Sequence, residues 1–379
     1  MASRRAFVQG TGWAALAAFT GVPAMAAAAA PRWAPYRDTI SIDALSGSEL
    51  FYLPEGDPGV PAALQALRDS GMTALMVAPA PQGRFWYTDA AFEKTKREME
   101  AWKAAVARHP DVLTLIGEHA DLERARRERK VGVIFTFQGT EPLGEDPDRI
   151  PMFRAMGLRV LQLTHNRRNL IGDGCMEPGN AGLSNLGHQV VERLNAEKVV
   201  IDLAHGSQRT IREAILASKA PVLIGHTGCR ALVDVPRLVH DEELKLMADR
   251  GGVAGIIFWP YIREQGQQTS ADVIRHIEHA LKVCGEDHVG IGTDINLTPV
   301  DVTPDYVREN TEMLKGMIAD GIFEQGRDPN LLLFVADLNV ANRFEVLASL
   351  LSARGHSDAR IAKILGGNFA RVMGEAWGG

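Results

Sequence analysis

The strongest constraint on the fold is a series of short apolar segments that alternates with amphipathic segments from residue 39 onward. The apolar segments are continuous and rich in β-branched residues, which is typical of parallel strands buried on both faces. They span 39–45, 73–80, 112–117, 131–139, 158–165, 199–205, 221–228, 253–259 and 288–294. The amphipathic segments predict helices over 92–107, 184–196, 207–218, 241–250 and 270–283. So regular an alternation predicts an α/β fold, a closed (β/α)8 TIM barrel.

Nine predicted strands compete for eight places in such a barrel. We expect 112–117 to be the extra strand, because the short helix predicted over 118–130 could pack it outside the barrel. An open doubly wound sheet is disfavoured, since no G-x-G-x-x-G motif follows the first strand. After Asp294 the sequence is mostly helical, and no Pro-rich or Ser-rich linker divides the chain. We therefore predict one domain over 31–379 with a helical C-terminal cap.

The first 30 residues have the features of an export signal. Arg4 and Arg5 precede a weakly apolar run, and Ala24-Met25-Ala26 offers a small-residue cleavage site. A membrane anchor is the alternative, but the Gly, Thr and Pro residues of the run make it a poor span. The sequence predicts a twin-arginine signal peptide over 1–30, a periplasmic or exported location, and no transmembrane segment in the mature chain.

Composition limits the partners and the covalent links. Of the 379 residues 46% are hydrophobic, enough for a full core, and a net charge of −6 gives no indication of nucleic acid as a partner. Export would permit disulfides, but Cys175, Cys229 and Cys284 allow at most one. Their spacing fits no zinc module, so we interpret them as small buried residues with at most one bridge.

Polar side chains close several of the predicted strands. Gln138, His165, His205, His226 and Asp294 each stand at or near the end of an apolar segment. The carboxyl ends of barrel strands converge on one mouth, where barrel enzymes keep their chemistry. A single histidine after a strand is more often structural than a ligand, but three histidines and an aspartate at equivalent ends predict a shared site.

Two neutral imidazoles and a carboxylate can hold Zn²⁺ and leave a position for water, an arrangement suited to amide hydrolysis. His205 and His226 are the best ligand candidates. Asp294 could be a further ligand, the base for the water, or both in turn. His165 is better placed to donate to developing oxyanion charge. Arg237 could bind a substrate carboxylate through two parallel hydrogen bonds, although a solvated arginine at a helix start is the alternative.

At these residues the chain resembles the renal or membrane dipeptidase family, peptidase family M19, which are zinc-dependent barrel hydrolases that cleave dipeptides. The resemblance spans roughly residues 39–373, and its RNLIGDGC loop is similar to a bacterial subgroup. It is carried by the motifs LQLTHNRRNLIGDGC, AGLSNLG, VIDLAHGS, KAPVLIGHTGCRAL, PRLVHDEEL, HIEHALKVCGEDHVGIGTD and ILGGNFARV. It implies a barrel of the metal-dependent hydrolase type, with a small peptidic substrate or ligand.

The resemblance also implies roles for single residues. The family uses two zinc ions, and the two histidines of its second site correspond to His205 and His226. Its substrate-polarising histidine corresponds to His165, its carboxylate-binding arginine to Arg237, and its eighth-strand aspartate to Asp294.

The first metal site departs from the family pattern. Where the family motif resembles IDGHND, this chain reads IDALSG, so Leu45 and Gly47 replace the ligand histidine and aspartate. The glutamate that bridges both zinc ions corresponds to Gln138, a neutral amide that binds zinc poorly. Asp43 and Glu141 are alternative ligands if their carboxylates reach the mouth. We expect one zinc ion, with the first site lost.

Three functions are compatible with this pattern. The first is a one-zinc hydrolase of dipeptides or a related small peptidic amide. The second is a catalytically impaired family member that binds a peptide-like ligand through Arg237 and His165. The third is an enzyme for another step in the processing of a peptidic natural product. A homodimer is compatible with each of them.

Overall fold

The computed structural model describes residues 31–80 and 89–378, so the expected signal peptide lies outside the described residues. Eight parallel strands form a nearly closed barrel, and this confirms the predicted fold class. In spatial order they are β1 (Ile42–Asp43), β3 (Ala74–Val77), β5 (Val131–Phe137), β6 (Leu158–Gln162), β7 (Val200–Asp202), β8 (Leu223–Thr227), β9 (Val253–Ile256) and β10 (Val289–Ile291).

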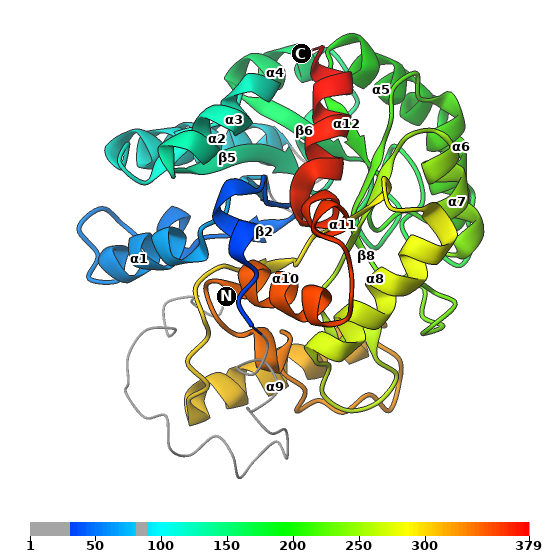
Figure 1. Ribbon diagram of the computed structural model, residues 1–379. Coiled ribbons are helices and arrows are strands. Elements are labelled where there is room, and N and C mark those ends of the chain that lie inside the picture. Colours follow the sequence, from blue (N-terminus) through cyan, green and yellow to red (C-terminus); the bar gives the residue numbers. More distant parts are fainter. Residues whose placement is uncertain (1–30, 81–88, 379) are drawn as a thin grey trace.

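Helices surround the strands on the outside of the barrel (Figure 1). They are α1 (Val60–Ser70), α2 (Asp89–Arg108), α3 (His119–Glu128), α4 (Arg149–Met156), α5 (Asn185–Ala196), α6 (Gln208–Ala217), α7 (Asp241–Asp249) and α8 (Ser270–Cys284). The five helices that periodicity predicts are all present, within three residues of their predicted ends. Ser184 and Ser207 cap α5 and α6 by accepting hydrogen bonds from Gly187 N and Thr210 N. Among the described residues no helix combines the length and apolar character needed to cross a bilayer.

The C-terminal cap consists of α9 (Pro304–Ala319), α10 (Arg343–Ala353), α11 (Asp358–Ala362) and α12 (Asn368–Trp377). Helix α12, red in Figure 1, packs against β7, β9 and β10. Its Phe369 and Met373 join the apolar cluster that fills the barrel interior, which includes Met76 and Ile134. The cap therefore seals the apolar layer of the barrel and leaves the carboxyl ends of the strands for polar groups.

Strand β4 (Leu113–Leu115) is the extra strand, as predicted, and it lies off the path of the eight barrel strands while pairing with β5. Its three residues pair with Val131 to Val133 of β5, and β6 pairs with β5 only from Phe135 onward. Because β5 has seven residues, β4 pairs with its first part and β6 pairs with its last part.

The barrel closes between its first and last strands through a short seam. One backbone bond joins the strands directly, from Ala44 N to Ile291 O (3.0 Å). The carboxylate of Asp43 accepts hydrogen bonds from the backbone N (2.7 Å) and Oγ1 (2.6 Å) of Thr293. Beyond it, β2 (Ser46–Gly47) pairs in parallel with β11 (Ile295–Asn296). Both strands of this second ladder were missed by the sequence analysis, since each has only two residues.

The cysteines form no bridge. Cys175, Cys229 and Cys284 are all free thiols, and Cys229 is buried. The interpretation as small residues of the interior therefore holds for Cys229, while Cys175 and Cys284 are half-buried.

Asp43→Asn should flatten the pH dependence of stability. Burial raises the pKa of the Asp43 carboxyl to about 7, although the hydrogen bonds from Thr293 oppose this rise. A carboxyl whose pKa is raised by folding stabilises the native state fully below its unfolded pKa near 4, and this contribution is lost as the pH rises through 7. In urea unfolding of metal-free protein, the free energy of unfolding should fall between pH 4 and 8, by up to about 4 kcal/mol from this group. The fall should be smaller in Asp43→Asn.

Thr293→Val is the matched variant for this measurement. It keeps the Asp43 carboxyl and removes the hydroxyl that lowers its pKa, so its stability should decline more steeply with pH than that of the wild type. Equal slopes in all three proteins would contradict a protonated Asp43 in the seam.

Candidate metal centre and active site

The structure brings the polar residues at the strand ends together at one mouth. Gln138 follows β5, His226 lies within β8, and His165, His205 and Asp294 each stand three residues after β6, β7 and β10. The ring of His165 stacks on that of His205, with centroids 4.1 Å apart. The Gln138 side chain is close enough to Asp294 to lower the pKa of its carboxyl. The convergence expected from parallel strands is therefore realised.

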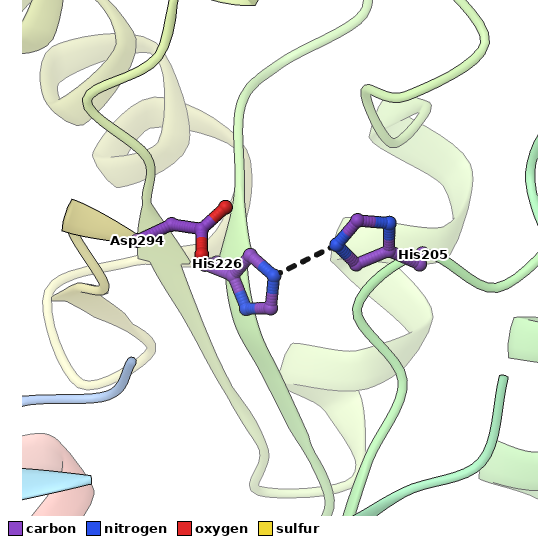
Figure 2. Close-up of side chains that lie close together, drawn as sticks. All are labelled: His205, His226 and Asp294. Carbon is purple, nitrogen blue, oxygen red and sulfur yellow. Dashed lines mark hydrogen bonds between the residues drawn. The ribbon is translucent and has the colours of Figure 1, made fainter. Parts of the chain in front are cut away.

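His205, His226 and Asp294 form the centre of this group. One ligand atom from each lies within 4.8 Å of the others. The Nε2 atoms of the two histidines face each other at 2.9 Å, and the Asp294 carboxylate points toward the same region (Figure 2). On the far side of its ring, His205 Nδ1 lies 2.6 Å from Asn166 Oδ1. Asn166 was not singled out in the sequence, although it directly follows His165.

The histidines of the mouth are neutral at ordinary pH. Burial, followed by the nearby Arg237 cation, holds the pKa values of His205 and His226 well below the usual range. The same two causes lower the pKa of His165 to about 4. His226 Nδ1 is buried without a hydrogen-bond partner among the described residues. Neutral imidazole nitrogens that face each other beside a carboxylate are a donor set that fits Zn²⁺.

Asp294 is half-buried, and protein surrounds most of its carboxyl. Burial raises its pKa to about 7, against the opposing effects of Arg237 and of the neighbouring Gln138 side chain. Two bonds hold its backbone: its N donates to Leu45 O (2.8 Å), and Trp259 Nε1 donates to its O (2.7 Å). Asp294 and His205 both adopt left-handed backbone conformations, with φ of 58° and 63°. Such strain in non-glycine residues is characteristic of functional sites.

Arg237 lies in the loop between β8 and α7, and only 2% of its surface is exposed. Its Nη2 donates to His226 O (2.9 Å), whereas Nε and Nη1 have no partner among the described residues. The alternative of a solvated arginine is therefore wrong. A buried guanidinium with two free donors is suited to a ligand carboxylate.

Tyr261 is a second residue that the sequence analysis missed. The Arg237 guanidinium lies 5.9 Å from the centroid of its ring, which stacks on Phe323 at 4.4 Å. It belongs to the short 3₁₀ helix Pro260–Ile262, directly after the segment predicted as the strand 253–259. The two aromatic residues Trp259 and Tyr261 at the end of that predicted strand could have indicated a residue near the site.

The positions of the family's first metal site are built into the barrel seam. Leu45 is buried and its carbonyl accepts from Asp294 N. A Cβ added to Gly47 would lie 2.3 Å from Asn296 Oδ1, so the Asn296 amide occupies the space of a side chain there. Asp43 is engaged with Thr293 in the seam and is not part of the three-residue cluster. Glu141 is also outside the cluster, and its Oε2 is buried without a partner among the described residues.

Comparison with known proteins decides the family. The model of the membrane dipeptidase family, peptidase family M19, matches residues 56–322. The chain belongs to this family. The resemblance seen in the sequence is thereby confirmed.

Curated relatives and solved structures agree with this assignment. The chain is 26% identical over 290 residues to dipeptidase verJ of Clonostachys rogersoniana, covering 75% of this chain and 66% of that protein. It is 26% identical over 306 residues to dipeptidase ataJ of Aspergillus terreus, covering 74% of this chain and 66% of that protein. The chain thus spans just under two thirds of the length of these relatives.

Among solved structures, an amidohydrolase from Pseudomonas aeruginosa superposes with a TM-score of 0.75 at 26% identity, covering 91% of this chain and 98% of that one. The probable dipeptidase PvdM from the same species gives a TM-score of 0.73 at 21% identity, covering 90% and 96%. A metallopeptidase from Rhodobacter sphaeroides gives 0.72 at 17% identity, covering 90% and 100%, and its structure holds a phosphinate mimic of the dipeptide L-Ala-D-Ala. The likeness to the last two concerns the fold alone.

Two buried arginines should respond to the same substitution with opposite sign. Arg237 is buried with two unpaired donors, so Arg237→Met should raise the free energy of unfolding of the metal-free protein, by about 1 kcal/mol. Arg343 is equally buried, but its three nitrogens donate to the carbonyls of Val340, Asn296 and Leu297. Arg343→Met leaves those carbonyls without donors and should lower stability by about 2 kcal/mol or more.

Urea unfolding of both variants at pH 7 provides the measurement. Destabilisation of Arg237→Met as large as that of Arg343→Met would mean that Arg237 is held for stability rather than kept available for a ligand.

Proposed function

We propose that this chain is a metal-dependent hydrolase of dipeptides or of a related small peptidic amide, and that it works with one metal ion, Zn²⁺. The observation that carries the proposal is the cluster of two neutral imidazoles and one carboxylate whose ligand atoms lie within 4.8 Å. The names of the curated relatives, both dipeptidases, support the substrate class. The dipeptide mimic held by a structural neighbour supports a ligand of the same chemistry.

His205 and His226 would hold the ion through their Nε2 atoms, together with a carboxylate oxygen of Asp294. An ion bound there supplies polarisation of the substrate carbonyl and a lowered pKa for an attacking water. Arg237 would fix the free carboxylate of the substrate with the two donors that have no partner in the protein. That anchor positions the amide carbonyl over the cluster, where His165 can donate to its oxygen as negative charge develops.

Asp294 is the residue placed to move the proton. Its pKa near 7 is close to the value at which a carboxylate both accepts and releases a proton readily at neutral pH. We infer that one Asp294 oxygen takes the proton of the attacking water and later delivers it to the leaving amine. Trp259 and Leu45 hold the Asp294 backbone for this role.

The proposal of a single ion rests on the first-site positions. The resemblance assigns the family's bridging glutamate to Gln138, whose neutral amide adds no negative charge. Leu45 contributes an apolar side chain, and Asn296 covers Gly47. No anionic ligand remains there to offset a second divalent charge.

A catalytically impaired protein that binds a peptide-like ligand is the second candidate. It is favoured by the same loss of first-site ligands, combined with the retention of the buried and partly unpaired Arg237. The two candidates differ in turnover and agree in ligand binding.

Purified protein should contain one zinc ion per chain by mass spectrometric metal analysis, and His226→Ala should contain none. Rebuilding the first site should raise the content to two. The rebuilt variant carries Leu45→His, Gly47→Asp and Gln138→Glu, together with Asn296→Ala to make room for the new aspartate. Two tightly bound ions in the wild type would refute the one-ion proposal.

Substitutions of Asp294 and Arg237 should affect turnover and ligand binding differently when a panel of dipeptides is assayed. With added Zn²⁺ we expect weak hydrolysis of ordinary L-dipeptides that Asp294→Asn reduces by about 100-fold or more. Arg237→Met should weaken binding of a dipeptide by roughly 10- to 100-fold and leave binding of its C-terminal amide almost unchanged. Turnover equal in wild type and Asp294→Asn indicates a contaminant, and binding without any turnover indicates the impaired protein.

A further inference from the structure

Asn166 links the predicted ligand His205 to the thiol of Cys175. Its side chain is buried, with 8% exposed. Its Oδ1 lies 2.6 Å from His205 Nδ1 and also accepts a weak hydrogen bond from Cys175 Sγ at 3.6 Å. No role in the proposed reaction uses Asn166 or Cys175, yet both contact the centre of the site.

The bond to Asn166 determines which nitrogen of His205 carries the proton. An amide oxygen only accepts hydrogen bonds, so His205 Nδ1 must be the donor. An imidazole that carries a single proton on Nδ1 has none on Nε2, which then presents its lone pair. That lone pair faces His226 Nε2, in the middle of the cluster.

His226 has no comparable partner. Its Nδ1 is buried without a hydrogen bond among the described residues. With His205 Nε2 restricted to accepting, the 2.9 Å contact between the rings requires the proton of His226 on Nε2 in the metal-free protein. His205 is thus fixed with its proton on Nδ1, the tautomer that leaves Nε2 free to bind a metal. The proton of His226 can move from Nε2 to Nδ1, because its Nδ1 has no partner among the described residues.

The orientation of the Asn166 amide is itself fixed by the loop that carries Cys175. Cys175 N donates to His205 O (2.7 Å), and Met176 N donates to Asn166 O (2.8 Å). Gly174 pairs with Gly206, and a Cβ on Gly174 would lie 2.0 Å from the carbonyl oxygen of His165. The absence of a side chain at Gly174 therefore lets the loop come close enough for the Cys175 thiol to meet Asn166.

A turned amide would direct its NH₂ group toward both His205 and the thiol hydrogen. The thiol is a donor and only a weak acceptor, so it favours the orientation in which Oδ1 accepts from both groups. In this arrangement two donors, His205 Nδ1 and the Cys175 thiol, converge on one acceptor, Asn166 Oδ1.

We propose that Asn166 is a positioning residue of the metal centre, which holds His205 with its proton on Nδ1 and its Nε2 lone pair toward the ion, and that Cys175 fixes the Asn166 amide for this purpose. The metal-binding part of this inference rests on the proposed function. The tautomer part concerns the metal-free chain and stands independently.

The test is a long-range ¹H–¹⁵N correlation spectrum of metal-free, histidine-labelled protein, with His205 and His226 assigned by substitution. We expect His205 protonated on Nδ1 and His226 on Nε2. Asn166→Leu removes the acceptor at similar volume and should shift His205 toward the Nε2-protonated form. Asn166→Asp keeps an accepting oxygen and should restore the wild-type tautomer.

Zn²⁺ affinity is the second readout. Loss of such a partner typically weakens metal binding by about 10- to 100-fold, so we expect this loss in Asn166→Leu and rescue in Asn166→Asp. Cys175→Ala removes the donor and should show mixed tautomers of His205, and Cys175→Ser should show a smaller mixture, because a hydroxyl donates to Oδ1 but also accepts from a turned amide.

Asn169→Ser is the matched control from the same loop. Asn169 donates to Thr140 Oγ1 and Leu163 O and makes no contact with the cluster, so its loss should lower stability without changing the tautomers. His205 protonated on Nε2 in the wild type, or Asn166→Leu with unchanged tautomer and affinity, overturns the proposal. If the tautomers are as expected but the protein binds no Zn²⁺, Asn166 still fixes the tautomer of His205, and the proposed function is overturned instead.

Discussion

The seam between the first and last strands is the constraint on which the mouth of the barrel depends. One direct backbone bond joins β1 to β10, and the buried carboxyl of Asp43 supplements it through Thr293. The chain then continues into the β2–β11 ladder, and Asp294 lies between β10 and β11. The position of Asp294 is therefore set by barrel closure, because its N is bonded to Leu45 on the opposite side of the seam. Asp43, which helps to close the barrel, is thus bonded to Thr293, the residue directly before the one that we assign to catalysis.

The same seam contains two positions that the resemblance assigns to the family's first metal site. Leu45 and Gly47 now contribute backbone groups to the ladder, and Asn296 fills the space above Gly47. Gln138 lies beside Asp294 and lowers the pKa of its carboxyl. Leu45 and Gly47 thus contribute to barrel closure at positions that the resemblance assigns to metal ligands.

Ionisable groups are buried at the mouth of the barrel. Burial, and then the Arg237 cation, lowers the pKa values of His165, His205 and His226, while burial raises the pKa of Asp294. Two nitrogens of Arg237 have no hydrogen-bond partner among the described residues. Unpaired buried donors and acceptors reduce stability, and they persist where a ligand supplies the missing partner. Such atoms at His226 and Arg237, opposite the apolar layer sealed by α12, support the ligand site that we propose.

The sequence by itself determined the barrel, its helices, the extra strand and the family, because periodic burial and the order of motifs are properties of the chain. It also placed His165, His205, His226 and Asp294 at one mouth, since the carboxyl ends of parallel strands converge whatever the loops do. Only the tertiary structure decided which partners these residues meet. Asn166 and Tyr261 reach the site through the paths of loops, and the two-residue strands β2 and β11 are too short to leave a periodic signal. Whether Arg237 is solvated or buried likewise depended on long-range packing, which no local pattern encodes.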